Sequence, residues 1–370
     1  MCCWLWMLWV FLASFTDATN SPLVNLQEHR VTATYRDTLN KAFLRFRDWC
    51  CQHRGIVPED FKRDPEQLNK LLIDHVQFLY EERLGVSAGR HAVLSIHHKF
   101  PLLRPFLRES WDSIKSWEQL APVKLRTPMP PLVHSCMFIF SLLMGFQSTG
   151  PIARDWISFA VGLLCCFEGL LRPGEWCALR CGQVAVPAQR FHGLVKNAML
   201  TVLNGKNRRV FGRIQIAMLD EGRGVDWLTW LVSGLDKKSR LFHGGTGKFR
   251  KLFAVAVKAL RLESLGLTPA SLRAGGATFL FVSGSLDIGR IQYRGRWASL
   301  STLQHYLQEA SAQLAMLQLS DPTVQRLLEF HDRGRFFDEP PSQPWSAFFS
   351  RPPPGWMKAN SSRRSALRRR

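Results

Sequence analysis

Hydrophobic positions in the first third of the chain recur at the spacing of an amphipathic helix. Leu39, Phe43, Phe46 and Cys50 lie on one face, with charged residues between them. A second run of the same kind extends from Leu68 to Leu79. The pattern then predicts a turn, a third helix and a fourth, over residues 85–89, 90–99 and 111–120. This part of the chain is therefore predicted to be a small helical bundle.

Residues 121–131 contain four prolines and interrupt the helical pattern, so they are the best candidate for a boundary between domains. Beyond Asp332 the chain is rich in proline, serine and arginine, which is typical of disorder. We therefore expect an apolar or unstructured segment, a helical domain, a linker, a second domain and a disordered basic tail, over residues 1–30, 31–120, 121–131, 132–331 and 332–370.

The second domain opens with apolar sequence and then changes its period. Residues 156–171 are almost wholly apolar but short for a membrane span, which favours a buried core helix. Pro173 suits the first turn of the next helix, with Glu175 near its positive end. Residues 198–203 and 209–216 read as two strands joined by an Asn204-Gly205 hairpin turn.

Helical sequence resumes after the hairpin and continues through the rest of the second domain. We expect one helix over residues 247–265, a second that Thr268-Pro269 opens, a short one over 288–294, and a long one that Ser301 caps and that continues to Leu317. The fold class is thus mainly α (α+β): a helical bundle followed by a mostly helical domain with a small antiparallel sheet.

The chain carries 49 Lys and Arg against 29 Asp and Glu, a formal net charge of +20. An excess of this size favours a polyanionic partner, which means DNA, RNA or an acidic membrane surface. The nine cysteines form three adjacent pairs and three singles, a pattern that favours a reducing compartment and predicts no metal site. Residues 2–15 are apolar, short for a span and without a basic leader, so a secreted or membrane-anchored protein is a minor alternative.

Five residues of types that suit phosphoryl transfer follow one another in the second domain. Arg172 stands in an R-x-x-E sequence, Lys206 follows the predicted hairpin turn, and Arg273 is placed on a predicted helix. Trp297 and Tyr306 follow, nine residues apart. Taken singly, each arginine is usually a surface ion-pair partner and each tyrosine a packing residue, so the order and spacing of the set carry the argument.

This ordered set resembles the tyrosine recombinase (phage integrase) family, mobile-element-derived type, over residues 155–318. The helical segment before it resembles that family's core-binding domain more loosely. The resemblance implies cleavage of a DNA strand by Tyr306, which leaves a 3′-phosphotyrosyl bond and a free 5′ hydroxyl. Arg172 and Arg273 would hold the nonbridging oxygens with forked, charged donors, and Lys206 would protonate the leaving oxygen. Trp297 would donate to the phosphate or support the tyrosine helix, and no metal or other cofactor is required.

The sequence departs from the family at two positions near Arg273, and one of them is the residue directly after it, which is often His in the family and is Ala274 here. The box before Arg273 normally begins with His or Lys, and here that position is Ala270. Loss of a positioned general base typically costs about 10²–10⁴ in rate. His305, the residue directly before Tyr306, is a poor substitute for that base, because adjacent side chains on a helix point about 100° apart. Two alternatives follow: a recombinase with weakened activity, or a catalytically inactive DNA-binding relic of a mobile element. A type IB topoisomerase would share the chemistry.

Double-stranded DNA is the expected partner, with a possible homo-oligomer on DNA, no small-molecule substrate and a nuclear location if the source is eukaryotic. Basic side chains in both predicted domains are candidates for contacts with the phosphate backbone. They are Lys41, Arg45, Arg90, Lys99, Arg208, Arg213, Arg294 and Arg296.

Overall fold

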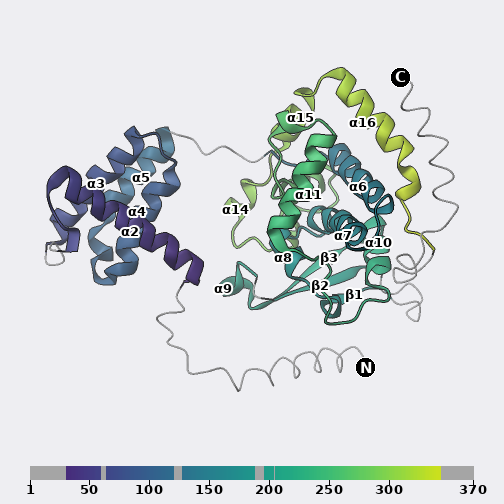
Figure 1. The fold of residues 1–370 in the computed structure, drawn as a ribbon, viewed down its shortest axis with the longest axis horizontal. Helices are drawn as coiled ribbons and strands as arrows, with labels where there is room; N and C mark the ends of the chain where they lie inside the picture. Colours follow the sequence, from purple (N-terminus) through teal and green to yellow (C-terminus); the bar gives the residue numbers. More distant parts are fainter. Residues whose placement is uncertain (1–30, 60–63, 121–126, 188–195, 204, 343–370) are drawn as a thin grey trace, which may run out of the picture. The chain divides into compact units, whose positions relative to one another are not determined.

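The computed structural model describes residues 31–59, 64–120, 127–187, 196–203 and 205–342 (Figure 1). The apolar segment 2–15 and residues 343–370 lie outside these ranges. The chain divides into two compact units, with the division between Lys124 and Leu125. Each unit has its own hydrophobic core and is described by itself.

The first unit is a helical bundle, as the hydrophobic pattern predicts. Its helices are α2 (Ala33–Arg54), α3 (Pro65–Glu81), α4 (Val86–Lys99), the 3₁₀ segment η4 (Pro101–Phe106) and α5 (Arg108–Leu120). The predicted turn over residues 85–89 is wrong, because α4 already begins at Val86. Gly89 lies inside α4, where a Cβ atom would meet the side chains of Ile114 and Trp117 on α5. This glycine therefore permits close helix packing.

The second unit is built around two apolar helices, α6 (Pro131–Phe146) and α7 (Gly150–Phe167), which lie side by side (Figure 1). By length and composition α7 would be apolar enough to cross a membrane, but 72% of it is buried inside the unit. It is the core helix that the sequence predicts. Around the pair lie α8 (Pro173–Ala178), α10 (Arg223–Val232), α11 (Gly245–Ala259), α12 (Ser271–Val282), α13 (Ile288–Gly295), α14 (Leu300–Gln304), α15 (Glu309–Leu317) and α16 (Asp321–Arg333).

A small antiparallel sheet of three strands completes the second unit: β1 (Val184–Ala185), β2 (Ala198–Leu203) and β3 (Ile214–Leu219), in that order. The unit is mainly helical with one small sheet, which confirms the predicted fold class. The predicted two-residue turn is wrong. Leu203 pairs with Ile214, so a loop that contains the short helix α9 (Arg208–Phe211) separates the strands. The returning strand covers 214–219 instead of 209–216.

The segment that contains Tyr306 is also shorter than predicted. Ser299, and not Ser301, caps α14 by accepting a hydrogen bond from the backbone N–H of Thr302. The expected long helix is divided at Tyr306 into α14 and α15. The Thr278 hydroxyl of α12 donates to the backbone carbonyl of Tyr306 and accepts from the N–H of Gln308, at 3.0 and 3.3 Å. These two bonds replace helical ones, because a backbone group so engaged no longer pairs within the helix.

Order in the second unit extends past the predicted start of the tail at residue 332. Helix α16 packs on α6 (Figure 1), and the 3₁₀ segment η8 (Arg335–Phe337) follows it. Phe337 is buried against Phe146, and its carbonyl accepts a hydrogen bond from the indole N–H of Trp227 at 2.9 Å. The hydrophobic residues of this segment thus complete the core.

Candidate functional site

Arg172 occupies the connection between α7 and α8. The chain leaves α7 through Leu170, which has a positive φ of 51°, and Arg172 then stands at the N-cap of α8 with Pro173 in the first turn. Glu175 accepts hydrogen bonds from the backbone N–H and from the guanidinium of Arg172, at 2.9 and 2.7 Å. The R-x-x-E spacing therefore fixes both the backbone and the side chain of Arg172.

Glu175 also binds Arg296, at 2.7 Å between Oε2 and a terminal guanidinium nitrogen. Both side chains are almost fully buried, at 8% and 3% exposed. Burial alone would raise the pKa of Glu175, but the Arg296 guanidinium and the bonds from Arg172 hold it below its usual value. The carboxylate of Glu175 thus binds two arginines. The ion pair between Glu175 and Arg296 is buried, where either charge without its partner would be costly.

Arg273, Trp297 and Tyr306 pack against one another. The Arg273 guanidinium lies 4.3 Å from the Trp297 ring centre and 5.8 Å from the Tyr306 ring centre. The two rings are 5.1 Å apart and tilted by 58°. Arg273 also donates a hydrogen bond to the carbonyl of Gly295. A Cβ atom on Gly295 would overlap the Trp297 ring, so only glycine fits at this position. Arginine and tyrosine, which are 33 positions apart in the sequence, are therefore brought together in one chain.

Several N–H donors in this cluster are buried and have no protein partner. They are Nε and one terminal nitrogen of both Arg273 and Arg296, together with the indole N–H of Trp297. Burial lowers the pKa of Arg273, and the positive charges of Arg172 and Arg296 lower it further. The lowered pKa of Arg273, about 9, still lies above neutrality, so the guanidinium remains charged at pH 7. The site thus contains three guanidinium groups, one carboxylate and several N–H donors without a partner. An anion bound there would supply the missing acceptors.

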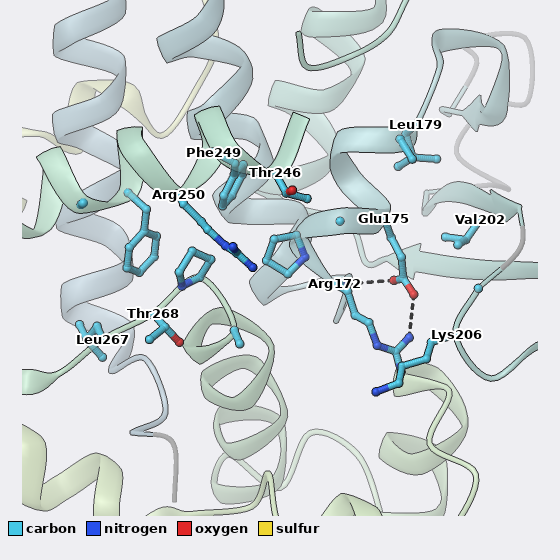
Figure 2. A pocket seen from close by; sticks show the side chains of 18 of the residues that line it. Arg172, Glu175, Leu179, Val202, Lys206, Thr246, Phe249, Arg250, Leu267 and Thr268 are labelled. Carbon is cyan, nitrogen blue, oxygen red and sulfur yellow. Dashed lines mark hydrogen bonds and ion pairs between the residues drawn. The ribbon is translucent and has the colours of Figure 1, made fainter. Parts of the chain in front are cut away.

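Lys206 lies in the loop between β2 and β3 and lines a groove with a volume of about 1440 Å³. Arg172 and Glu175 line the same groove and lie near Lys206 at one end of it in the view of Figure 2, where Arg250 points in from farther along. The side chain of the next residue, Asn207, donates to the backbone carbonyl of Arg296 at 2.7 Å. The lysine loop is thus joined to the segment that carries Trp297.

Ala270 lines the groove at the N-cap of α12, which begins at Ser271 and not at Thr268-Pro269. The methyl group offers no proton acceptor where the family that the sequence resembles carries His or Lys. His305, the other candidate, is exposed. Within the ranges that the structure describes, no group of His, Cys, Asp and Glu side chains is arranged to hold a metal ion.

The basic residues expected to contact DNA occupy varied positions. Arg296 does not lie on the surface as expected, because its side chain is buried in the ion pair with Glu175. Arg294 is 11% exposed and pairs with Asp220. The remaining six are exposed: Lys41, Arg90 and Lys99 in surface ion pairs, Arg45 on α2, and Arg208 and Arg213 in the β2–β3 loop.

Three basic residues that line the groove were not predicted from the sequence: Arg180, Arg250 and Lys258. Two of them lie on α11, a helix with basic residues on its outer face. Their helical spacing was visible in the sequence, but only the fold shows that this face borders the groove.

No family model and no curated protein sequence matches the chain. Among solved structures, XerA recombinase is similar over 83% of this chain and 94% of its own, with 17% identity and a TM-score of 0.34. XerH site-specific recombinase, in a post-cleavage complex with palindromic difH substrate, is similar over 78% of this chain and 76% of its own. The identity is 13% and the TM-score is 0.45. Tn1549 transposon integrase, in complex with transposon right end DNA, is similar over 74% of this chain and 98% of its own. The identity is 13% and the TM-score is 0.45. These values do not by themselves place the chain in a family.

Proposed function

We propose that this protein binds double-stranded DNA and cleaves and rejoins its strands with Tyr306 as the nucleophile, in the manner of a tyrosine recombinase. The observation that carries the proposal is the buried cluster in which Arg273 contacts both Trp297 and Tyr306 and leaves two N–H donors without a partner. A phosphodiester is the anion that such donors, beside a tyrosine, are suited to bind and activate.

In the proposed reaction the Tyr306 oxygen attacks phosphorus and the bond from phosphorus to the 5′ oxygen breaks. The phenol releases its proton to solvent, because Ala270 offers no acceptor, and the 5′ oxygen gains a proton from the Lys206 ammonium. The phosphotyrosyl bond conserves the energy of the broken bond, so that attack by a 5′ hydroxyl reverses the step. Arg172 and Arg273 stabilise the charge that develops on the nonbridging oxygens. Three guanidinium groups against the single carboxylate of Glu175 leave an excess of two positive charges for this purpose.

A second candidate function is binding without cleavage, and Ala270 is the observation that favours it. This residue lines the groove in the place where a proton acceptor is expected, and it offers only a methyl group. Phosphate contacts by the exposed basic residues of the β2–β3 loop and by Arg250 do not depend on that acceptor. On this alternative the protein is a DNA-binding relic, and we expect it in the nucleus if its source is eukaryotic.

Covalent trapping separates the two functions. Duplexes with randomised sequence and sulfur in place of the 5′ bridging oxygen accumulate the adduct, because the released thiol religates poorly. We expect an adduct that resists denaturant with the natural chain and none with Tyr306→Phe. Ala270→His should raise the rate by about 10²–10⁴ if the missing base limits it.

An adduct that forms only with Ala270→His would establish the relic. If neither protein forms one while both bind duplex DNA, cleavage by this fold is refuted. Binding itself should weaken steeply with salt, and Arg250→Ala should reduce the slope of log K against log salt by about 1 if that side chain contacts a phosphate. Relaxation of supercoiled plasmid without sequence preference would instead favour topoisomerase activity.

A further inference from the structure

Lys206 needs a fixed position to act on a leaving oxygen, but it lies in an exposed loop. Strand β2 ends at Leu203 and strand β3 begins at Ile214, and Lys206 between them is itself exposed. A flexible four-carbon side chain on an unsupported loop would spend little time near one phosphate oxygen. Something in the fold must therefore restrain the loop.

The side chain of Asn207 supplies such a restraint. Its amide donates to the backbone carbonyl of Arg296 at 2.7 Å, across 89 positions of sequence. The backbone carbonyl of Asn207 meanwhile accepts from the N–H groups of Val210 and Phe211, at 3.0 Å each, and so begins α9. The residue next to Lys206 thus closes the local turn and joins the loop to the rest of the unit.

The acceptor of this bond is itself rigid. Arg296 has the left-handed backbone conformation, with φ of 55°, which is uncommon for a residue other than glycine. Its guanidinium is held by Glu175 and by the carbonyl of Leu170, at 2.7 and 3.3 Å. Glu175 in turn holds Arg172. The carbonyl that receives Asn207 is therefore fixed relative to Arg172 and precedes Trp297 directly.

We infer that Asn207 is a positioning residue that holds Lys206 against the phosphate site through the carbonyl of Arg296. The inference rests on the proposed function, because it assigns Asn207 a task only if Lys206 is the proton donor. Asn207 contacts no reacting atom in this scheme. Arg296 then acts as the fixed point between the arginine site and the lysine loop, which accounts for its burial.

The contact itself is tested without any reaction. Trypsin cleaves after Lys206, Arg208 and Arg213 when the loop opens, and mass spectrometry follows each product in the full chain. Loss of one hydrogen bond in Asn207→Ala should speed these cuts by about 3- to 10-fold. Asn197→Ala is the matched control, since Asn197 donates to the Met218 sulfur at the other end of β2. Equal rates in Asn207→Ala and the natural chain would overturn the inference.

The task is tested by changing the leaving group. A phosphodiester substrate needs a proton on its 5′ oxygen, whereas a 5′ sulfur leaves as thiolate, because thiols have a pKa of about 8.5. Asn207→Ala should slow covalent adduct formation on the phosphodiester by about 3- to 10-fold, because the same hydrogen bond is lost, and should leave the rate on the sulfur substrate unchanged. Lys206→Ala should show the same selectivity with a larger loss, and the double variant should be no slower than Lys206→Ala.

The possible failures are distinct from one another. An Asn207→Ala defect that is equal on both substrates would overturn the inference, since the residue would then act on the whole site. An unchanged rate on the phosphodiester would overturn it as well. If the natural chain forms no adduct with either substrate, the proposed function is refuted and the role of Asn207 with it. In that case the trypsin result still reports whether the loop is restrained.

Discussion

Gly276→Ala should destabilise the second unit, although alanine is the better helix former. Gly276 lies on α12 one turn after Arg273, where a Cβ atom would lie 2.8 Å from the carbonyl carbon of Phe167 and would overlap its oxygen. It would also lie 3.0 Å from Leu170 Cδ2. Phe167 ends α7, and Arg172 follows shortly after it. This close approach therefore sets the separation between the segments that carry the two arginines.

The expected magnitude follows from two opposing effects. Alanine gains about 1 kcal/mol over glycine in a helix interior. Overpacking against a side chain typically costs about 1–3 kcal/mol, and the upper end or more applies here because the obstacle is backbone. The free energy of unfolding should therefore fall by about 2 kcal/mol or more, which corresponds to a decrease in Tm of about 4–8 °C or more for a unit of this size. Arg273 would be displaced as well, so on the proposed function the covalent adduct with DNA should form more slowly.

Gly247→Ala is the matched control for this prediction. Gly247 lies in α11 with open space where its Cβ would be, so the same chemical change should raise the free energy of unfolding by up to about 1 kcal/mol. Calorimetry of the full chain follows the transition of the second unit in each variant. The reasoning is refuted if Gly276→Ala is as stable as the natural chain, or if both variants shift in the same direction.

Two further predictions concern buried carboxylates of the second unit. Burial raises the pKa of Glu168 to about 7. Between about pH 4.5 and 7 the folded protein therefore holds a proton that the unfolded chain has released. The stability that this group contributes is present at acid pH and is lost as the pH rises from about 4.5 through 7. Relative to Glu168→Gln, the natural chain should lose about 3 kcal/mol between pH 4.5 and 8 in denaturant titrations, and a constant difference would contradict this. Glu175→Gln should lower the free energy of unfolding at pH 7 by about 3 kcal/mol, because it leaves Arg296 buried without a counter-charge. Glu329→Gln, which removes an exposed partner of Arg333, should be close to neutral, and equal losses in the two variants would argue against the buried network.

Hydrophobic periodicity predicted the helices of both units well, because burial of one face decides where a helix lies. It failed where a distant contact outweighs a local preference. Asn204-Gly205 is a strong turn signal, but the pairing of Leu203 with Ile214 leaves a longer loop between the strands. The helix expected through Tyr306 is interrupted because Thr278, far away in sequence, binds the backbone on either side of residue 307. Neither contact has a local sequence signal.

The site was predictable in its members more than in its organisation. Order and spacing selected Arg273, Trp297 and Tyr306, which the fold brings into contact. The same spacing could not place Arg296, because a basic residue two positions after another one, Arg294, is typical of a surface segment. Its left-handed backbone turns the side chain inward to Glu175, and that conformation depends on the surrounding packing.

The hydrogen bond from the Trp227 indole to the Phe337 carbonyl has a consequence for where the chain can be shortened or fused. A chain that stops before Phe337 would leave a buried indole without its acceptor and would uncover the face of Phe146. Partner proteins or affinity tags joined after Glu339 would leave that contact intact. The carbonyl of Phe337 therefore marks how far the chain can be shortened from its C-terminal side. It lies within the region that composition alone would suggest is a dispensable tail.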